Sequence, residues 1–154
     1  MAAWGDVVVL FGGFQDTGKA TRYLDDLWLF DIRSRHWIKV DWMNEYEGRP
    51  SARSGFCFQS HPEGILLYGG YTQIKEKSGA IHGQTLNDLW LLRLDSEDGK
   101  SLRWKKLKLV PGAPSPRSGS SSVVVSPQEM MSFGGVIDED ISDEHLIGTC
   151  VNSW

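Results

Sequence analysis

The chain has 154 residues and a formal net charge of −4, made of 16 Lys and Arg against 20 Asp and Glu. This length can form a sizeable core, and the mixture of charges argues against a nucleic-acid-binding surface and against a basic membrane-binding patch. The sequence has no apolar run of about 18 residues that could span a bilayer, and residues 1–6 do not resemble a signal peptide. We therefore expect an intracellular protein, cytoplasmic or nuclear, that does not associate with membranes.

The composition indicates an all-β protein. The chain carries seven Trp and 17 Gly, and its apolar runs are short and bounded by Gly, Pro, Ser and Asp rather than repeated with the period of a helix. The two cysteines, Cys57 and Cys150, are too few for a disulfide scaffold and lack the spacing of metal ligands. Cys57 lies in an apolar stretch, so we expect a reduced, buried thiol there.

The first part of the chain, residues 1–49, predicts an incomplete antiparallel unit. Its expected strands cover residues 7–11, 26–31 and 37–40, and a polar loop is expected over residues 14–24. Gly12 and Gly13 should end the first of these strands, because paired glycines lose the side-chain packing of a strand. Residues 1–4 resemble only the end of an inner strand, so the unit is expected to begin partway.

The second part, residues 50–113, predicts a complete unit, and residues 114–154 predict a truncated one. Four strands are expected in the second unit, over residues 53–58, 65–68, 88–94 and 103–109, with a long loop over residues 71–86. Four short strands joined by turns form a meander, and a repeated meander is typical of propeller blades. The third unit is expected to have a strand over 117–125, a glycine pair and a loop over 136–149 before the chain runs out.

The repeat is long for a propeller. Gly12 and Gly69 are 57 residues apart, and Gly69 and Gly134 are 65 apart. Trp28 and Trp90 are 62 apart. These spacings exceed the roughly 40 to 45 residues of a WD40 blade and lie nearer to the about 50 residues of a kelch repeat.

The combined motif resembles kelch repeats. The first two copies have a strand ending in an aromatic residue and two glycines, then Asp-Leu-Trp, then a lone Trp, and the third copy repeats only the aromatic residue and the two glycines. The copies are linked by Pro, one or two residues, and Arg-Ser-Gly. The resemblance covers essentially the whole chain, and within kelch proteins it is nearest to the group of kelch domain-containing protein 4. It implies a partial β-propeller built of four-stranded antiparallel blades. The residues that match the motif are Gly12, Gly13, Trp28, Trp37, Tyr68, Gly69, Gly70, Trp90, Trp104, Gly134 and Gly135.

The resemblance also implies how the blades are held together. Phe11 or Tyr68, together with Trp37 and Trp104, is expected to fill the space between adjacent blades. Propellers usually close from about four to eight blades, and this chain supplies about two and a half. We therefore expect open strand edges that lead to dimers, aggregates or partial folding of the isolated chain.

The function that the resemblance implies is a non-enzymatic scaffold for binding another protein. In similar kelch proteins the arginine before the small residue and Gly lies at the mouth of the central channel and meets acidic segments of partners, which here implicates Arg53 with Ser54 and Arg117 with Ser118. The alternative is that both arginines bind loop carbonyls and orient the blades. Loops on a rigid scaffold often carry binding residues, so Tyr71, Gln73, Lys75 and Lys77 are candidate contacts as well.

Other chemistry finds weaker support in the sequence. The acidic stretch 138–145 could hold a metal, but it lacks the spacing of a calcium loop, and we expect a solvated loop and no metal or cofactor. The basic strand residues Arg103, Lys105, Lys106 and Lys108, which follow Lys100, could contact nucleic acid, but more often mark a solvated strand edge. No catalytic residues are predicted. The alternative function is a non-catalytic piece of a propeller-type oxidase or glycosidase.

Overall fold

The computed structural model describes residues 1–41, 48–94, 102–137 and 149–150, and this part of the chain is entirely β. It contains no helix long and apolar enough to cross a membrane. The strands of the first half are β1 (Ala2–Trp4), β2 (Val7–Asp16), β3 (Thr21–Asp31), β4 (His36–Lys39), β5 (Cys57–His61) and β6 (Gly64–Lys75). Those of the second half are β7 (Ile81–Leu94), β8 (Leu102–Leu107), β9 (Ser121–Ser126), β10 (Glu129–Phe133), β11 (Val136–Ile137) and β12 (Thr149–Cys150).

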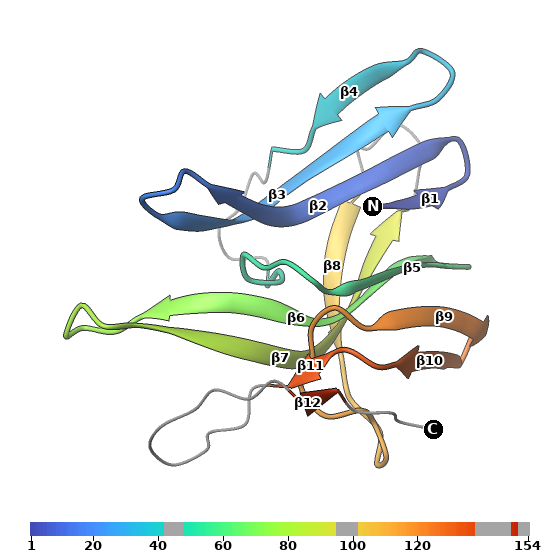
Figure 1. Cartoon of the computed structure of the whole chain (residues 1–154). Helices are drawn as coiled ribbons and strands as arrows, with labels where there is room; N and C mark the ends of the chain where they lie inside the picture. The colour runs from blue at the N-terminus through green and yellow to red at the C-terminus, as the bar shows by residue number, and fades with distance from the viewer. Residues whose placement is uncertain (42–47, 95–101, 138–148, 151–154) are drawn as a thin grey trace.

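Two four-stranded antiparallel meanders form the centre of the fold. Strands β1 to β4 pair in chain order in blade 1, and β5 to β8 do the same in blade 2. A third unit pairs β9 with β10 and β11 with β12. Figure 1 shows the three units one beyond the other, with blade 2 between blade 1 and the third unit. The predicted all-β architecture of four-stranded blades is confirmed.

Blade 1 differs from the expectation of an incomplete unit, because residues 1–4 do form a paired strand. In β1, Ala2 lies opposite Val9 and Trp4 lies opposite Val7. The strand has only three residues and reverses at once through Gly5 and Asp6. So short an apolar segment has no recognisable alternation, which is why the sequence pattern did not reveal it.

The first two glycine pairs do not end their strands, whereas Gly134 and Gly135 separate β10 from β11. Strand β2 continues past Gly12 and Gly13 to Asp16, and its pairing with β3 shifts register between Phe11 and Gly13. The same shift occurs in blade 2 between Tyr68 and Gly70. A bulge absorbs the extra residue and lets pairing continue. The predicted loops over residues 14–24 and 71–86 are therefore wrong: both segments belong to long hairpins.

The first glycine of each of the first two pairs lets the next unit approach. Gly12 and Gly69 have φ values of +56° and +68°, and a Cβ at these positions would lie 2.8 Å from the carbonyl oxygen of Arg53 and 2.7 Å from that of Arg117. These carbonyls accept hydrogen bonds from the N–H groups of Gly13 (2.8 Å) and Gly70 (2.9 Å). Only glycine can adopt this left-handed conformation while the carbonyl oxygen of the next unit lies so near to its Cα.

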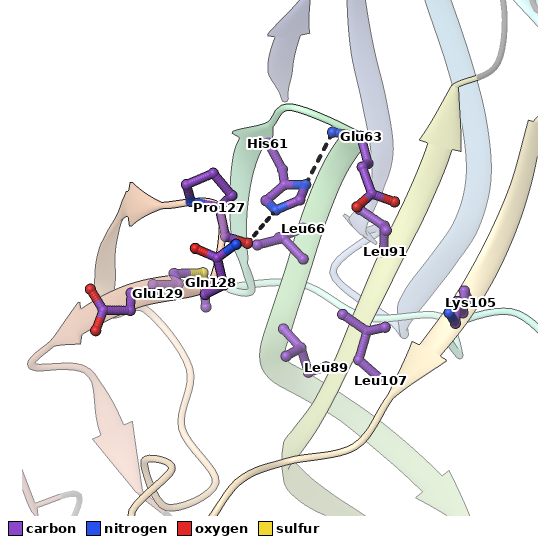
Figure 2. A pocket seen from close by; sticks show the side chains of 11 residues that line it. His61, Glu63, Leu66, Leu89, Leu91, Lys105, Leu107, Pro127, Gln128 and Glu129 are labelled. Carbon is purple, nitrogen blue, oxygen red and sulfur yellow. Dashed lines mark hydrogen bonds between the residues drawn. The ribbon is translucent and has the colours of Figure 1, made fainter.

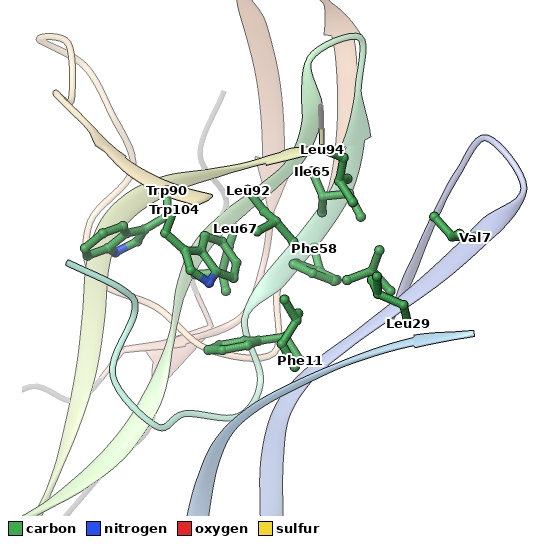
Figure 3. Packing of buried hydrophobic residues seen from close by; sticks show 12 residues of the cluster. Val7, Phe11, Leu29, Phe58, Ile65, Leu67, Trp90, Leu92, Leu94 and Trp104 are labelled. Atoms are coloured by element: carbon green, nitrogen blue, oxygen red, sulfur yellow. The ribbon is translucent and has the colours of Figure 1, made fainter. Parts of the chain in front are cut away.

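The hydrophobic core lies between blades 1 and 2 (Figure 3). Phe11 packs edge-on against Trp104, with ring centroids 5.2 Å apart, and both side chains are buried. Burying each such side chain contributes about 2 to 3 kcal/mol. The blade 1 residues of this core are Val7, Val9, Phe11, Leu27 and Leu29, and those of blade 2 include Phe58, Ile65, Leu67, Trp90, Leu92, Leu94 and Trp104.

The predicted packing role is confirmed for Phe11 and Trp104 but is wrong for Trp37. Trp37 is 49% exposed and contacts Phe30 at 5.1 Å between centroids. Successive strand residues face opposite sides, so Trp37 and its cross-strand partner Phe30 lie on the face of blade 1 that points away from blade 2. Tyr68 is buried on the other side of blade 2, where its hydroxyl donates to the carbonyl of Pro114 at 2.5 Å.

Cys57 is a buried free thiol, as predicted. Its sulfur lies 3.1 Å from the hydroxyl oxygen of Ser120 and 4.0 Å from that of Ser132. The thiol thus lies where blade 2 meets the third unit.

Candidate interaction surface

The Arg-Ser-Gly corner of blade 2 is built around a buried guanidinium. Arg53 is 1% exposed. Its Nη1 donates to the Gly69 carbonyl (3.0 Å) and to Asp88 Oδ1 (2.5 Å), while its Nη2 donates to Asp88 Oδ2 (3.0 Å). Ser51 accepts the remaining two bonds, through its carbonyl and its hydroxyl oxygen, at 3.0 Å each. All five guanidinium donors are therefore used within blade 2.

Arg117 repeats this arrangement in the third unit. It is also buried, and it donates to the Gly134 carbonyl at 2.9 Å and to the carbonyl and hydroxyl oxygens of Ser115 at 3.1 and 3.0 Å. For both arginines the structure favours the alternative role, in which they bind loop oxygens and fix the blades. Their adjacent serines are in the same corners: Ser54 pairs through its backbone with Tyr71 and Ser118 with Val136.

Asp88 is held ionised by these contacts. Burial acts to raise the pKa of its carboxyl group, but the hydrogen bonds from Arg53 and Trp90 and the positive charge of Arg53 outweigh that effect and lower the pKa below its usual value. The indole Nε1 of Trp90 donates to Asp88 Oδ2 at 2.7 Å. The Trp of the Asp-Leu-Trp motif therefore orients the carboxylate that binds the arginine.

The two long hairpins, β2–β3 and β6–β7, carry a row of aromatic side chains. The ring of Phe14 lies 6.1 Å from that of Tyr23, and Tyr23 lies 5.9 Å from Tyr71, so the row crosses from blade 1 to blade 2. Tyr71 also lies across Gly83, where a Cβ would meet its ring and hydroxyl group. Tyr23 was not singled out by the sequence, although its place opposite Phe14 follows once the segment is known to be a hairpin.

A cleft of about 260 Å³ lies between these hairpins. Gln73 and Lys75, two of the predicted contact residues, line it, and both are exposed. Lys77 is exposed in the turn of the β6–β7 hairpin rather than in the cleft. The other lining residues are Thr21, Tyr23, Ala52, Thr72 and Ile81. The structure thus brings together Tyr71, Gln73 and Lys75 with residues of blade 1.

A second hollow, of about 250 Å³, lies between blade 2 and the third unit (Figure 2). At one end His61 Nδ1 accepts the backbone N–H of Glu63 at 3.1 Å, which leaves Nε2 to donate to the Pro127 carbonyl at 2.9 Å. Its apolar wall consists of Leu66, Leu89, Leu91 and Leu107. The bond from His61 to Pro127 links the two units, so this hollow is a junction between blade 2 and the third unit.

The remaining candidates contribute no site in the described residues. No group of three or more His, Cys, Asp or Glu side chains there could hold a metal ion, and the acidic stretch 138–145 lies outside the described residues. Among the basic residues of β8, Lys106 has its ammonium group 5.5 Å from the ring centroid of Trp90. That contact occupies Lys106 in a cation–π interaction within blade 2.

Comparisons with known proteins agree with this architecture. The KLHDC2/KLHL20/DRC7 kelch-repeats domain family matches residues 1–154. Host cell factor from Drosophila melanogaster is 32% identical over 152 residues, covering 90% of this chain and 9% of that protein. An F-box/kelch-repeat protein from Arabidopsis thaliana is 31% identical over 134 residues, covering 85% of this chain and 25% of that protein. The chain therefore spans a quarter or less of these relatives.

Among solved structures, that of YjhT is similar with a TM-score of 0.49 and 17% identity, over 76% of this chain and 28% of that one. Kelch-repeat domains are typically protein-interaction modules. With a match over its full length and the glycine pairs, buried arginines and Asp-Leu-Trp motifs in equivalent places, the chain belongs to the kelch-repeat family.

Proposed function

We propose that this chain is a non-enzymatic, intracellular protein-interaction module that presents its paired hairpins to a protein partner. The observation that carries the proposal is the cleft between β2–β3 and β6–β7, which is lined by Tyr23 and by exposed polar side chains and lies beside Tyr71. Tyr23 and Tyr71 supply the aromatic contact area, while Gln73 and Lys75 supply polar groups. Aromatic cores with polar rims are typical of protein interfaces.

The buried arginines have a supporting role in this proposal. Arg53 binds blade 2 through Asp88 and Gly69, and its backbone carbonyl binds Gly13 of blade 1. The Arg-Ser-Gly corner therefore fixes the base from which both hairpins extend. A rigid base reduces the entropy lost when loops bind a partner.

The narrower likeness to the kelch domain-containing protein 4 group is part of the proposal. It is supported by the Arg-Ser-Gly segments at 53–55 and 117–119 and by Phe133-Gly-Gly-Val136. It implies a protein partner and names none.

The test is quantitative affinity purification from cells with three forms of the chain. We expect proteins that co-purify with the wild type to be reduced at least tenfold with the double variant Gln73→Ala, Lys75→Glu. Lys105→Glu, an equal change of charge at an exposed lysine of strand β8, is the matched control and should retain them. Equal recovery with both variants would contradict a partner site at the hairpins.

A further inference from the structure

In blade 2, Arg53 is bound by the Asp88 carboxylate, which Trp90 orients, and by the Gly69 carbonyl. The carboxylate–tryptophan part of this cluster recurs in blade 1. Asp26 Oδ2 accepts the indole N–H of Trp28 at 2.8 Å, just as Asp88 Oδ2 accepts that of Trp90 at 2.7 Å. In blade 2 the carboxylate also binds Arg53. In the described part of blade 1 no guanidinium reaches Asp26, since the nearby Arg49 pairs with Asp25 at 3.3 Å.

The backbone acceptor of the cluster recurs as well. Arg53 and Arg117 both donate through Nη1 to the carbonyl of the first glycine of their pair, Gly69 and Gly134. Gly12 is the third member of this set, with the same left-handed backbone: φ is +56° at Gly12, +68° at Gly69 and +72° at Gly134. Blade 1 therefore has both acceptors that hold a guanidinium in blade 2.

A third feature shared by the arginine corners is a backbone contact of the residue that follows the arginine. The residue after each of these arginines pairs through two backbone hydrogen bonds with the residue that follows the glycine pair: Ser54 with Tyr71 (2.9 and 2.8 Å), and Ser118 with Val136 (3.0 and 2.8 Å). The equivalent residue in blade 1 is Phe14, which is exposed. The blade 1 position is thus shaped for an extended Arg-Ser-Gly segment rather than for a free cation.

We propose that the end of blade 1 facing away from blade 2 is a binding site for an extended peptide with the sequence Arg-Ser-Gly. The guanidinium binds the Asp26 carboxylate and the Gly12 carbonyl, and the following residue pairs with the backbone of Phe14. Arginine is required because its planar fork engages two carboxylate oxygens at once, which an ammonium group does not do. This inference uses a different face from the hairpin cleft and does not depend on the proposed function.

The partial exposure of Asp26 predicts that binding is sensitive to salt. Arg53 is buried in blade 2, whereas an arginine bound at Asp26 would pair with a carboxylate that is partly exposed. Charge pairs that remain in contact with water are weakened by salt. Binding at Asp26 should therefore weaken as salt rises.

The experiment titrates the chain with a capped peptide that has the sequence of residues 50–56, Pro-Ser-Ala-Arg-Ser-Gly-Phe, and follows indole N–H signals by NMR. We expect saturable binding that shifts the Trp28 signal, identified with Trp28→Phe, and leaves the Trp90 signal in place. A peptide with Lys in place of Arg should bind at least tenfold more weakly. Movement of the Trp90 signal alone would show exchange with Arg53 and overturn the proposal.

The variant test uses Asp26→Asn, which keeps an oxygen for Trp28 but removes the charge. We expect at least a tenfold loss of peptide affinity with an unchanged circular dichroism spectrum, while Asp41→Asn, at an exposed carboxylate outside the strands, binds like the wild type. No saturable binding at millimolar peptide, or equal affinity of the Asp26→Asn variant, would overturn the proposal. If Asp26→Asn alters the spectrum, the comparison of the Arg and Lys peptides on the wild-type chain decides.

Discussion

Arg53 and Asp88 form a two-point ion pair inside blade 2, with Nη1–Oδ1 and Nη2–Oδ2 distances of 2.5 and 3.0 Å. The arginine side chain is 1% exposed and that of Asp88 is 19% exposed, so removing either partner leaves a charge that is largely shielded from water without its counterpart. The pair also connects the segment before β5 to the start of the Asp-Leu-Trp motif in β7. It is thus one of the contacts that define the blade.

Replacing Arg53 with Ala should lower the free energy of unfolding by about 3 to 5 kcal/mol, the usual cost of breaking a buried ion pair. Urea denaturation monitored by tryptophan fluorescence measures this change. The double variant Arg53→Ala, Asp88→Ala should lose less than the sum of the single variants, because it leaves no unpaired charge. Additive losses would show that the two side chains act independently.

Stability at acid pH should depend on Asp88. Its pKa is lowered in the folded chain, despite the opposing effect of burial, by Arg53 and Trp90. The ionised carboxylate therefore stabilises the fold above its unfolded pKa of about 4, and this contribution is lost as the pH falls through the lower, folded value. Asp88→Asn should reduce stability at pH 7 and flatten the decline in urea midpoint between about pH 5 and pH 2. An unchanged slope would contradict this assignment.

The sequence predicted the repeat and its key residues, because the glycine pairs recur in all three copies and the Asp-Leu-Trp and Arg-Ser-Gly segments each recur in two of them. It failed where pairing between strands decides the structure. Gly69 and Gly70 were expected to stop β6, yet a bulge carries the strand to Lys75. The start of β5 was placed at Arg53 instead of Cys57 for a related reason. Residues 53–56 lead directly into the apolar part of the strand, but they form a corner whose hydrogen bonds are divided between two blades.

The candidate contacts could be predicted only in part. Tyr71 was identified by residue type, but its partner Tyr23 lies 48 residues earlier in the chain and becomes its neighbour only when the two hairpins lie together. Arginine at a loop suggested an exposed binding residue. Its burial depends on Asp88, which lies 35 residues away and carries no sign of that pairing in the sequence.

Gly69→Ala should destabilise the chain by at least about 2 kcal/mol. The left-handed conformation alone costs a residue with a side chain about 1 to 2 kcal/mol, and the new Cβ would lie 2.7 Å from the Arg117 carbonyl. Thermal unfolding compares it with Gly48→Ala, a matched control at which a Cβ meets nothing within 4 Å. Gly48→Ala should change stability by less than about 0.5 kcal/mol. Equal effects of the two substitutions would rule out a special role for Gly69.

The isolated chain should self-associate through its two end faces. On blade 1 the face away from blade 2 carries Trp28, Phe30 and Trp37, equivalent in the repeat to Trp90, Leu92 and Trp104, which are buried against blade 1. The third unit exposes apolar side chains as well, with Val123 and Met131 paired across β9 and β10 and each more than half exposed. The face of one copy can therefore cover the opposite end of another, as blade 2 covers blade 1.

Sedimentation velocity tests this expectation, with dimers or larger species predicted for the wild type. The double variant Trp37→Gln, Met131→Gln should shift the population towards monomer, because it makes both ends more polar and leaves the core between the blades intact. Val110→Gln, at an apolar side chain that is 72% exposed in the connection after β8, is the matched control and should leave the distribution unchanged. A compact, stable wild-type monomer would contradict association by the end faces, since about half a kelch ring would then be stable without a partner for either end.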